Sequence, residues 1–144
     1  MLDTNTISYI ARNRSPEARR RFKEAEYQSP VYVSAISEAE VRYGLAKRPQ
    51  ARLASETMQE ILEQLTILPW TSNEAYAYGL LRARNERLGI AVGALDMLIA
   101  SHAVSQNAVL VTSDAAIAKL SGGPKTINWA NDLRTNGSQT GQLR

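Results

Sequence analysis

The chain is predicted to form one α/β domain of three layers, with helices on both faces of a central, mostly parallel sheet of about five short strands. Two observations predict this fold. Short apolar runs alternate with longer segments of helical periodicity along the sequence. The 144 residues, 44% of them hydrophobic, also fit a single domain with one full core. We expect residues 1–134 to form this domain and the polar residues 135–144 to form a disordered tail.

The strands are expected where aliphatic, β-branched and aromatic residues form runs too short for a helix. The run that ends at Thr112 is the clearest of them. The expected strands are Met1-Leu2, Val31–Val33, Ile67–Trp70, Ala108–Thr112 and Thr126–Trp129.

The helices are expected between these runs, and capping residues mark several of their starts. Ser15 precedes a proline at the first helical position, and Ser37 with Glu40 fits the capping-box pattern. Gly89 ends the longest helix, which begins at Ser72-Asn73-Glu74. The expected helices cover residues 5–11, 16–27, 37–48, 52–65, 72–88, 94–106 and 114–120.

The composition excludes several kinds of site. Without cysteine, the chain has no disulfide framework, no thiolate zinc site and no cysteine nucleophile. His102 is the single histidine, so sites built from several histidines are excluded as well. Oxygen ligands remain if a metal is bound. No apolar stretch is long enough to span a bilayer and MLDTN is not a secretory signal, so we expect a cytoplasmic protein.

Four acidic residues stand beside apolar runs or at expected helix starts: Asp3, Glu40, Asp96 and Asp114. Asp3 and Asp114 each follow a strand, and the carboxyl ends of parallel strands meet at one edge of a sheet. Clustered carboxylates repel one another unless a cation is bound, and Mg²⁺ and Mn²⁺ prefer oxygen ligands. Such an ion activates water and stabilises charge on a phosphate, which suits phosphodiester cleavage.

Each acid also has a purely structural interpretation. Asp3 and Asp114 could cap helices, and Glu40 could complete the capping box of Ser37. Asp96 could interact favourably with the helix dipole from the first turn of its helix. Only the four acids taken together favour a metal site.

The sequence resembles the PIN-domain ribonucleases, and among them the VapC toxins of bacterial toxin–antitoxin pairs, over about residues 1–129. The motifs that carry the resemblance are MLDTN, SAISEAEVRYGL, VGALDMLIASHA and VLVTSDAAI, with GGPKTINW as the last strand. The third is the most specific, with a glycine, an apolar pair, an aspartate and an apolar helix that ends in His-Ala. Relatives usually carry a few apolar residues before LDTN, so the first strand is expected to be short.

The resemblance implies a Mg²⁺- or Mn²⁺-dependent endoribonuclease whose catalytic acids are Asp3, Glu40, Asp96 and Asp114. Glu40 would be either a metal ligand or the group that orients the attacking water. Three polar residues would support the acids: Asn5 near the metal, and Thr112 and Ser113 beside Asp114.

The resemblance also implies the partners. Members of this group cleave structured RNA, with tRNA the leading expectation here. They form homodimers and are neutralised by a VapB antitoxin whose C-terminal segment covers the acidic groove. Two alternatives remain: a PIN-domain nuclease of RNA or DNA processing outside such a pair, and a non-catalytic PIN-like binding module.

Other conspicuous side chains have modest expected roles. His102 is expected to pack the end of its helix. The tyrosines 43, 76 and 78 are expected in the core or a dimer interface rather than under RNA bases. Two groups of cations are expected to face either solvent or RNA phosphates. The first group is Arg12, Arg14, Arg19, Arg20, Arg21 and Lys23, and the second is Arg82, Arg84 and Arg87.

Overall fold

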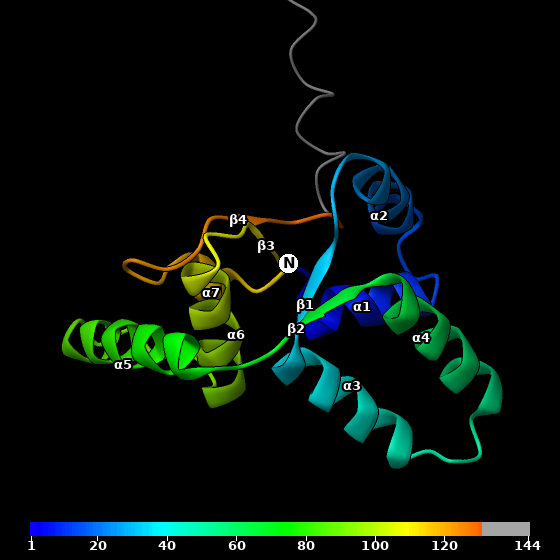
Figure 1. The fold of residues 1–144 in the computed structure, drawn as a ribbon, viewed down its shortest axis with the longest axis horizontal. Helices are drawn as coiled ribbons and strands as arrows, with labels where there is room; N and C mark the ends of the chain where they lie inside the picture. The colour runs from blue at the N-terminus through cyan, green and yellow to red at the C-terminus, as the bar shows by residue number, and fades with distance from the viewer. Residues whose placement is uncertain (131–144) are drawn as a thin grey trace, which may run out of the picture.

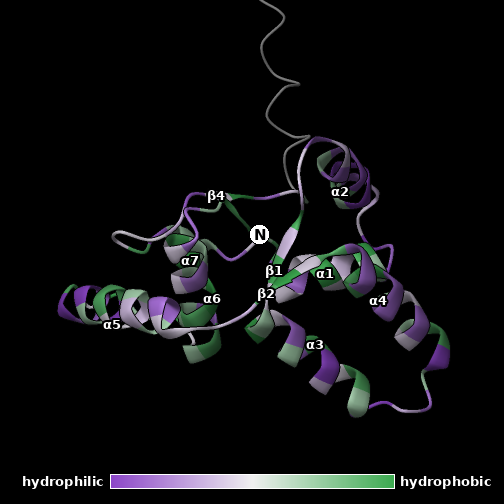
Figure 2. Cartoon of the chain, in the orientation of Figure 1, coloured by the Kyte–Doolittle hydropathy of each residue, from purple (hydrophilic) through white to green (hydrophobic). Residues whose placement is uncertain are grey.

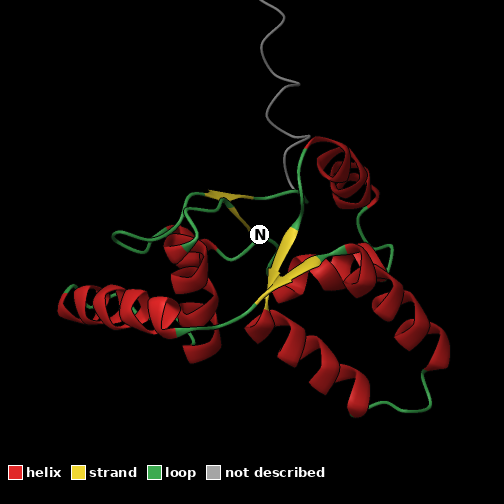
Figure 3. Ribbon diagram, viewed as in Figure 1, coloured by secondary structure: helices red, strands yellow, loops and turns green. Residues whose placement is uncertain are grey.

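The computed structural model describes residues 1–130, in which helices alternate with short strands (Figures 1 and 3). The expected tail, 135–144, lies outside the described residues. No helix of the described part is long and apolar enough to cross a membrane. The elements in chain order are α1 (Thr4–Ala11), α2 (Pro16–Gln28), β1 (Tyr32–Ser34), α3 (Ala35–Ala46), α4 (Arg52–Gln64), β2 (Thr66–Leu68), α5 (Ser72–Arg87), α6 (Ala94–Ser105), β3 (Leu110–Val111), α7 (Ala115–Ala118) and β4 (Thr126–Ile127).

The strands form two parallel pairs that the N-terminal segment joins. β1 pairs with β2, and β3 pairs with β4. Leu2 bridges both pairs in parallel, to Val33 on one side and to Val111 on the other. The order across the sheet is therefore β4, β3, Leu2, β1, β2. The predicted parallel arrangement is confirmed. The expected first strand is short, because only Leu2 of this segment forms bridges to its neighbours.

Helices cover both faces of this sheet, as the fold class predicted. Alternate residues of a strand point to opposite faces. The strand residues on one face are Leu2, Val33, Ile67 and Val111, and those on the other are Met1, Tyr32, Leu68 and Leu110. The first set packs against α1, α2 and α4, and the second against α5, α6 and α7 (Figure 1).

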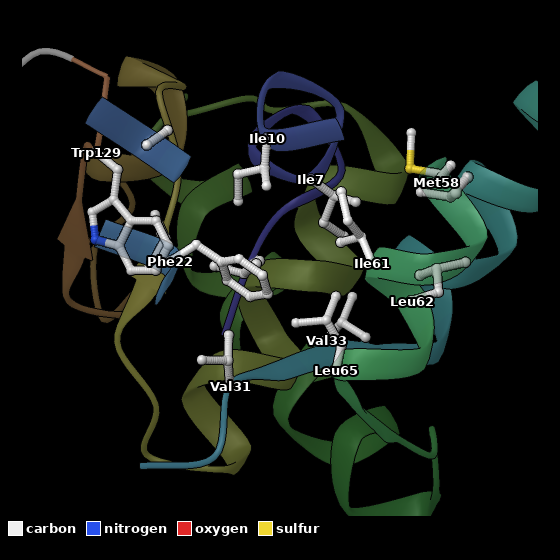
Figure 4. Packing of buried hydrophobic residues seen from close by; sticks show 14 residues of the cluster. Ile7, Ile10, Phe22, Val31, Val33, Met58, Ile61, Leu62, Leu65 and Trp129 are labelled. Carbon is white, nitrogen blue, oxygen red and sulfur yellow. The ribbon is translucent and has the colours of Figure 1, made fainter. Parts of the chain in front are cut away.

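The core on the α1 side is built from aliphatic residues and two aromatic ones. Ile7 and Ile10 of α1, Phe22 of α2 and Val33 of β1 point into one interior (Figure 4). Phe22 is buried although α2 is otherwise mostly polar (Figure 2). Trp129, beyond β4, is buried in the same cluster. α2 therefore attaches to the sheet mainly through one buried aromatic ring.

The start of α3 differs from the sequence prediction. The N-cap is Ser34, whose Oγ accepts a hydrogen bond from the backbone N–H of Ile36 at 3.1 Å. The helix therefore begins at the last residue of β1, and Ser37 lies inside it with its Oγ buried and unpaired. The expected capping box of Ser37 and Glu40 is wrong, because the end of the strand fixes where the helix starts.

The start of α5 is capped by Thr71 rather than by the residues after it. Thr71 and Glu74 form a capping box, and Glu74 is almost fully buried. Its Oε1 also accepts hydrogen bonds from the side chains of Ser105, at 2.7 Å, and Gln106, at 2.9 Å, at the end of α6. Thr71 above all lowers the pKa of the Glu74 carboxyl from 4.5 to about 2. Glu74 thus fixes α5 against α6.

The tyrosines lie nearer the surface than expected. Tyr43 and Tyr76 are 66% and 72% exposed, so their assignment to the core is wrong. Tyr78 is half-buried beside the cluster on the α6 side. A place in a dimer interface stays a prediction for all of them.

Glu74→Ala is expected to lower the free energy of unfolding at pH 7 by about 2–4 kcal/mol, because hydrogen bonds to a buried charge contribute about 1.5–3 kcal/mol each and are not additive. The folded pKa lies below the unfolded value, so this stabilisation is fully present above pH 4.5 and is lost as the pH falls through about 2. Urea unfolding followed by circular dichroism between pH 7 and pH 2 would measure it.

The matched control is Glu63→Ala, since Glu63 is exposed on α4. Its effect should stay within about 0.5 kcal/mol. An equal effect of the two substitutions at pH 7 would contradict the role given to Glu74.

Candidate metal centre

The four acids predicted from the sequence gather at the edge of the sheet where the parallel strands end. Asp3 follows Leu2 directly, and Asp114 stands shortly after β3. Glu40 lies on α3, which continues from β1, and Asp96 lies in the first turn of α6. The parallel topology brings the first two acids together, and helix packing adds the others.

Asp3 is the most firmly held of the four. It caps α1, and its Oδ1 accepts a hydrogen bond of 2.7 Å from the backbone N–H of Thr6. Its own N–H donates to the carbonyl of Val111 at 3.1 Å, and the Thr6 hydroxyl donates to the same carbonyl at 3.1 Å. These bonds hold the carboxyl group between α1 and β3, and Asp3 as a whole residue is only 5% exposed. The predicted cap is confirmed, and it leaves Oδ2 for a ligand.

Glu40 reaches this edge from α3. The Thr4 hydroxyl donates a hydrogen bond of 2.5 Å to Glu40 Oε2, which ties α3 to the first turn of α1. Glu40 therefore takes no part in capping its own helix. Its half-buried carboxyl group is held from outside that helix.

Asp114 is positioned by the strand before it. Its backbone N–H donates to Thr112 Oγ1 at 3.0 Å, and its Oδ1 caps α7 through the N–H of Ala116 at 2.7 Å. Thr112 is buried, whereas Ser113 and Asn5 are exposed. Thr112 is thus in place to orient Asp114, and Asn5 and Ser113 make no side-chain hydrogen bond within residues 1–130.

Asp96 experiences the charge of the other three acids. Burial is the first cause that raises the pKa of its carboxyl group, and the charges of Asp114, Glu40 and Asp3 follow in that order. Gly93, the residue before α6, leaves room for this side chain, because a Cβ at Gly93 would lie 3.1 Å from Asp96 Oδ2. The four carboxylates therefore share one electrostatic environment.

These acids fit a divalent cation by their chemistry. None of the four forms an ion pair with a lysine or arginine in the described part of the chain. The negative charge is therefore uncompensated, and every donor is a hard oxygen, as Mg²⁺ and Mn²⁺ prefer. Within residues 1–130 no three acidic or histidine side chains are already close enough to hold an ion. Ion binding would therefore need side-chain rotations that draw the carboxylates inward.

Three residues of this site escaped the sequence analysis: Thr4, Thr6 and Gly93. Thr4 and Thr6 flank the helix start in MLDTNT, where a threonine signals a cap but not which carboxylate or carbonyl it contacts. Gly93 stands in the VGALD motif, and its role depends on the rotamer of Asp96.

His102 lies inside the protein, as expected for a packing residue. It is fully buried, with Nδ1 2.8 Å from Ser34 Oγ and its ring edge-on to Trp70 at 5.7 Å between centroids. Burial lowers the pKa of the imidazole. His102 thereby connects α6 to the N-cap of α3.

The basic residues of α2 and α5 partly form surface ion pairs. Arg20 pairs with Glu17 and Glu24, and Arg21 also pairs with Glu17. On α5, Arg82 pairs with Glu86. For these arginines the solvated helix face is the better interpretation.

Comparison with known proteins gives the class. The profile of the PIN domain matches residues 1–123. The chain therefore belongs to the PIN-domain family, whose nucleases in general depend on divalent metal ions.

Within that family the similarity is to VapC ribonucleases. The chain is 34% identical to "Ribonuclease VapC2" of Rickettsia felis over 114 residues, which cover 79% of this chain and 85% of that protein. It is 28% identical over 130 residues to the "tRNA(fMet)-specific endonuclease VapC" of Shigella flexneri, with 90% and 97% covered.

Solved structures give the same result for the fold. VapBC2 of Rickettsia felis, bound to a DNA fragment from its promoter, matches with a TM-score of 0.83 and 28% identity over 90% of this chain and 97% of that one. DNA-bound VapBC of Salmonella typhimurium matches with a TM-score of 0.81 and 28% identity over 90% and 96%. The predicted α/β fold of the PIN type is confirmed.

Asp96→Asn is expected to stabilise the metal-free protein by an amount on the order of 1 kcal/mol, because it removes one of four repelling charges. Mg²⁺ or Mn²⁺ should raise the melting temperature of the unsubstituted protein, since an ion that binds the native state stabilises it. In Asp96→Asn this rise should largely disappear. Thermal unfolding in EDTA and in increasing metal concentration measures both effects.

The control is Glu38→Gln on the same helix as Glu40, since Glu38 pairs with Arg42. It should keep the metal-induced rise. Because the pKa of Asp96 is raised, the rise should weaken on acidification at a higher pH than an ordinary aspartate would give. An equal rise in the unsubstituted protein and in Asp96→Asn would exclude Asp96 from the site.

Proposed function

We propose that this chain is a metal-dependent endoribonuclease and the toxin of a toxin–antitoxin pair. The observation that carries the proposal is the group of four uncompensated carboxylates at the carboxyl edge of a PIN-domain sheet. The names of similar proteins, ribonuclease and tRNA(fMet)-specific endonuclease, support the reaction class.

In this proposal Asp3, Asp96 and Asp114 hold Mg²⁺ or Mn²⁺. When bound, the ion supplies positive charge that acidifies a water molecule and neutralises charge developing on the scissile phosphate. Hydrogen bonds already anchor two of the protein's carboxylates at this edge. Asp3 and Asp114 each use Oδ1 to cap a helix, which leaves Oδ2 of each for the ion.

Glu40 is either a further ligand or the group that orients the attacking water. The Thr4 hydroxyl donates a hydrogen bond to Glu40 Oε2. Oε1 is therefore the oxygen that would bind the ion or the water. As a base, Oε1 would accept the proton that the water loses on attack. The two roles differ in their effect on metal affinity, which Glu40→Gln tests.

The substrate that we infer is structured RNA, with tRNA as the first candidate. Proteins from Shigella flexneri and Salmonella typhimurium, 28% and 34% identical to this chain, are named tRNA(fMet)-specific endonucleases. For this chain tRNA specificity is a proposal that rests on those names. The choice of RNA depends on groove shape and on unpaired bases.

The partner that we infer is a VapB-type antitoxin. Similar solved structures are VapBC complexes, two of them bound to DNA. A homodimer of this chain remains a prediction.

Asp3→Asn, Asp96→Asn and Asp114→Asn are each expected to lower the rate of RNA cleavage by at least about 100-fold, since each removes a charged oxygen from a metal site that acts as a unit. EDTA should abolish cleavage, and Mg²⁺ or Mn²⁺ should restore it. The measurement is cleavage of bulk bacterial tRNA by purified protein, with 5′ ends mapped by sequencing.

Glu38→Gln is again the control and should cleave at the rate of the unsubstituted protein. If Glu40 is a ligand, Glu40→Gln should raise the metal concentration needed for half-maximal cleavage. If it orients water, the maximal rate should fall at unchanged metal dependence. Metal binding without cleavage of any RNA would support the alternative of a non-catalytic module instead.

Co-expression with a cognate VapB-type antitoxin is expected to restore growth that the toxin alone arrests and to block tRNA cleavage by the purified complex. The reason is that a basic segment laid across four uncompensated carboxylates neutralises them and excludes substrate. Growth assays and cleavage by the complex give the readout. A complex that cleaves at the rate of the free protein would favour a nuclease of RNA or DNA processing.

A further inference from the structure

A groove leads away from the acidic edge between α1, α3 and α4. Its volume is about 730 Å³, and Thr4 and Glu40 line it. Its wall includes apolar residues of α3 and α4, among them Val41 and Met58. The loop between α3 and α4 lies far from the strands (Figure 1). The groove therefore connects the acidic edge with the outer ends of these helices.

The outer part of the groove is basic. The lining cations are Arg12, Arg14, Lys47 and Arg48, and Glu40 is the single acid among the lining residues. None of the four cations forms an ion pair with an acid of residues 1–130, unlike Arg20 and Arg82. The groove thus changes from negative at the sheet to positive at its outer end.

Backbone hydrogen bonds at two helix ends position the residues that carry these cations. Arg12 ends α1, and Asn13 turns the chain with a φ of 52° so that the Arg14 N–H donates to the carbonyl of Tyr9. Lys47 ends α3, where the Arg48 N–H donates to the carbonyl of Leu45. Both pairs of cations stand at helix C-termini, where the dipole favours positive charge.

One aromatic ring stands among the cations. Tyr43 lines the groove and is 66% exposed, and Lys47 Nζ lies 5.2 Å from the centre of its ring. An exposed tyrosine flanked by cations is the combination on which unpaired bases of single-stranded nucleic acid stack.

The dimensions suit a short stretch of RNA. At about 1.5 Å per helical residue, Lys47 lies about 10 Å beyond Glu40 along α3, and Arg12 about 13 Å beyond Asp3 along α1. Consecutive phosphates of a stacked strand are about 3.4 Å apart along its axis. The spacing in an unstacked strand is larger, so these separations correspond to a few nucleotides at most.

We propose that this groove binds the single-stranded RNA that flanks the scissile phosphate, with the four cations on its phosphates and Tyr43 under one of its bases. The proposal rests on the proposed nuclease function and extends it to a substrate-binding site. Four cations without an ion pair in residues 1–130 and one exposed tyrosine match a polyanion with unstacked bases better than they match a protein segment.

The test measures binding apart from cleavage. In an Asp96→Asn background, fluorescence anisotropy would follow a labelled single-stranded RNA of about 12 nucleotides at several salt concentrations. Arg12→Gln and Arg48→Gln should each weaken binding and lower the slope of log affinity against log salt by about 0.7, the value for one lost phosphate contact on a single strand. The double variant should lower it by about twice that.

Tyr43 is tested in the same background. Tyr43→Ala should weaken binding about tenfold, with little change in salt slope, and Tyr43→Phe should bind like its parent, because stacking needs the ring and not the hydroxyl. The matched controls are Arg20→Gln and Arg82→Gln, which remove exposed cations that are already paired. Both should leave affinity and slope near those of the parent.

Three results would overturn the proposal. The first is a slope of log affinity against log salt in Arg12→Gln and Arg48→Gln equal to that of the controls, and the second is no binding of the RNA by the parent. The third is loss of antitoxin binding in these variants with RNA affinity unchanged. The last would assign the groove to a protein partner. If the proposed nuclease function is wrong, the unsubstituted protein will not cleave tRNA. The salt dependence of RNA affinity, measured by anisotropy, still decides whether the groove binds RNA.

Discussion

The fold depends on the backbone pairing of Leu2 between two strands that are far apart in sequence. Its N–H donates to the carbonyl of Tyr32 at 2.8 Å, and it bridges Val33 and Val111. Without this segment, β1–β2 and β3–β4 would be separate pairs. The same pairing sets Asp3 at the edge where the strands end, so formation of the sheet and placement of the first acid are one event.

Hydrogen bonds hold the acidic edge against the mutual repulsion of its carboxylates. Asp3 and Asp114 each cap a helix, and Thr4 holds Glu40. Capping and metal binding are therefore compatible, because each capping carboxylate uses one oxygen and keeps the other. The structural interpretation is confirmed for Asp3 and Asp114, which cap helices, and is wrong for Glu40, whereas the role of the acids as metal ligands stays a prediction.

Some sequence patterns are compatible with two different structural roles, and the sequence around them does not distinguish the two. The run S-x-x-E at Ser37 fits a capping box, yet Ser34 caps the helix because β1 delivers the chain directly into α3. The basic cluster near α2 appears uniform in sequence, but Arg20 pairs along its helix whereas Arg12 and Arg14 line a groove. The aromatic ring of Tyr43 is compatible with a core position, and only the packing of α3 leaves it exposed.

The sequence by itself determined the alternation of strands and helices, the parallel sheet and the four acids, since periodicity, caps and motifs are local properties of the chain. Only the tertiary structure decided which side chains meet: Thr4 with Glu40, His102 with Ser34, and the cations of two helix ends around one groove. The physical reason is that these contacts join residues of different elements, whose relative positions follow from burial of both faces of the sheet.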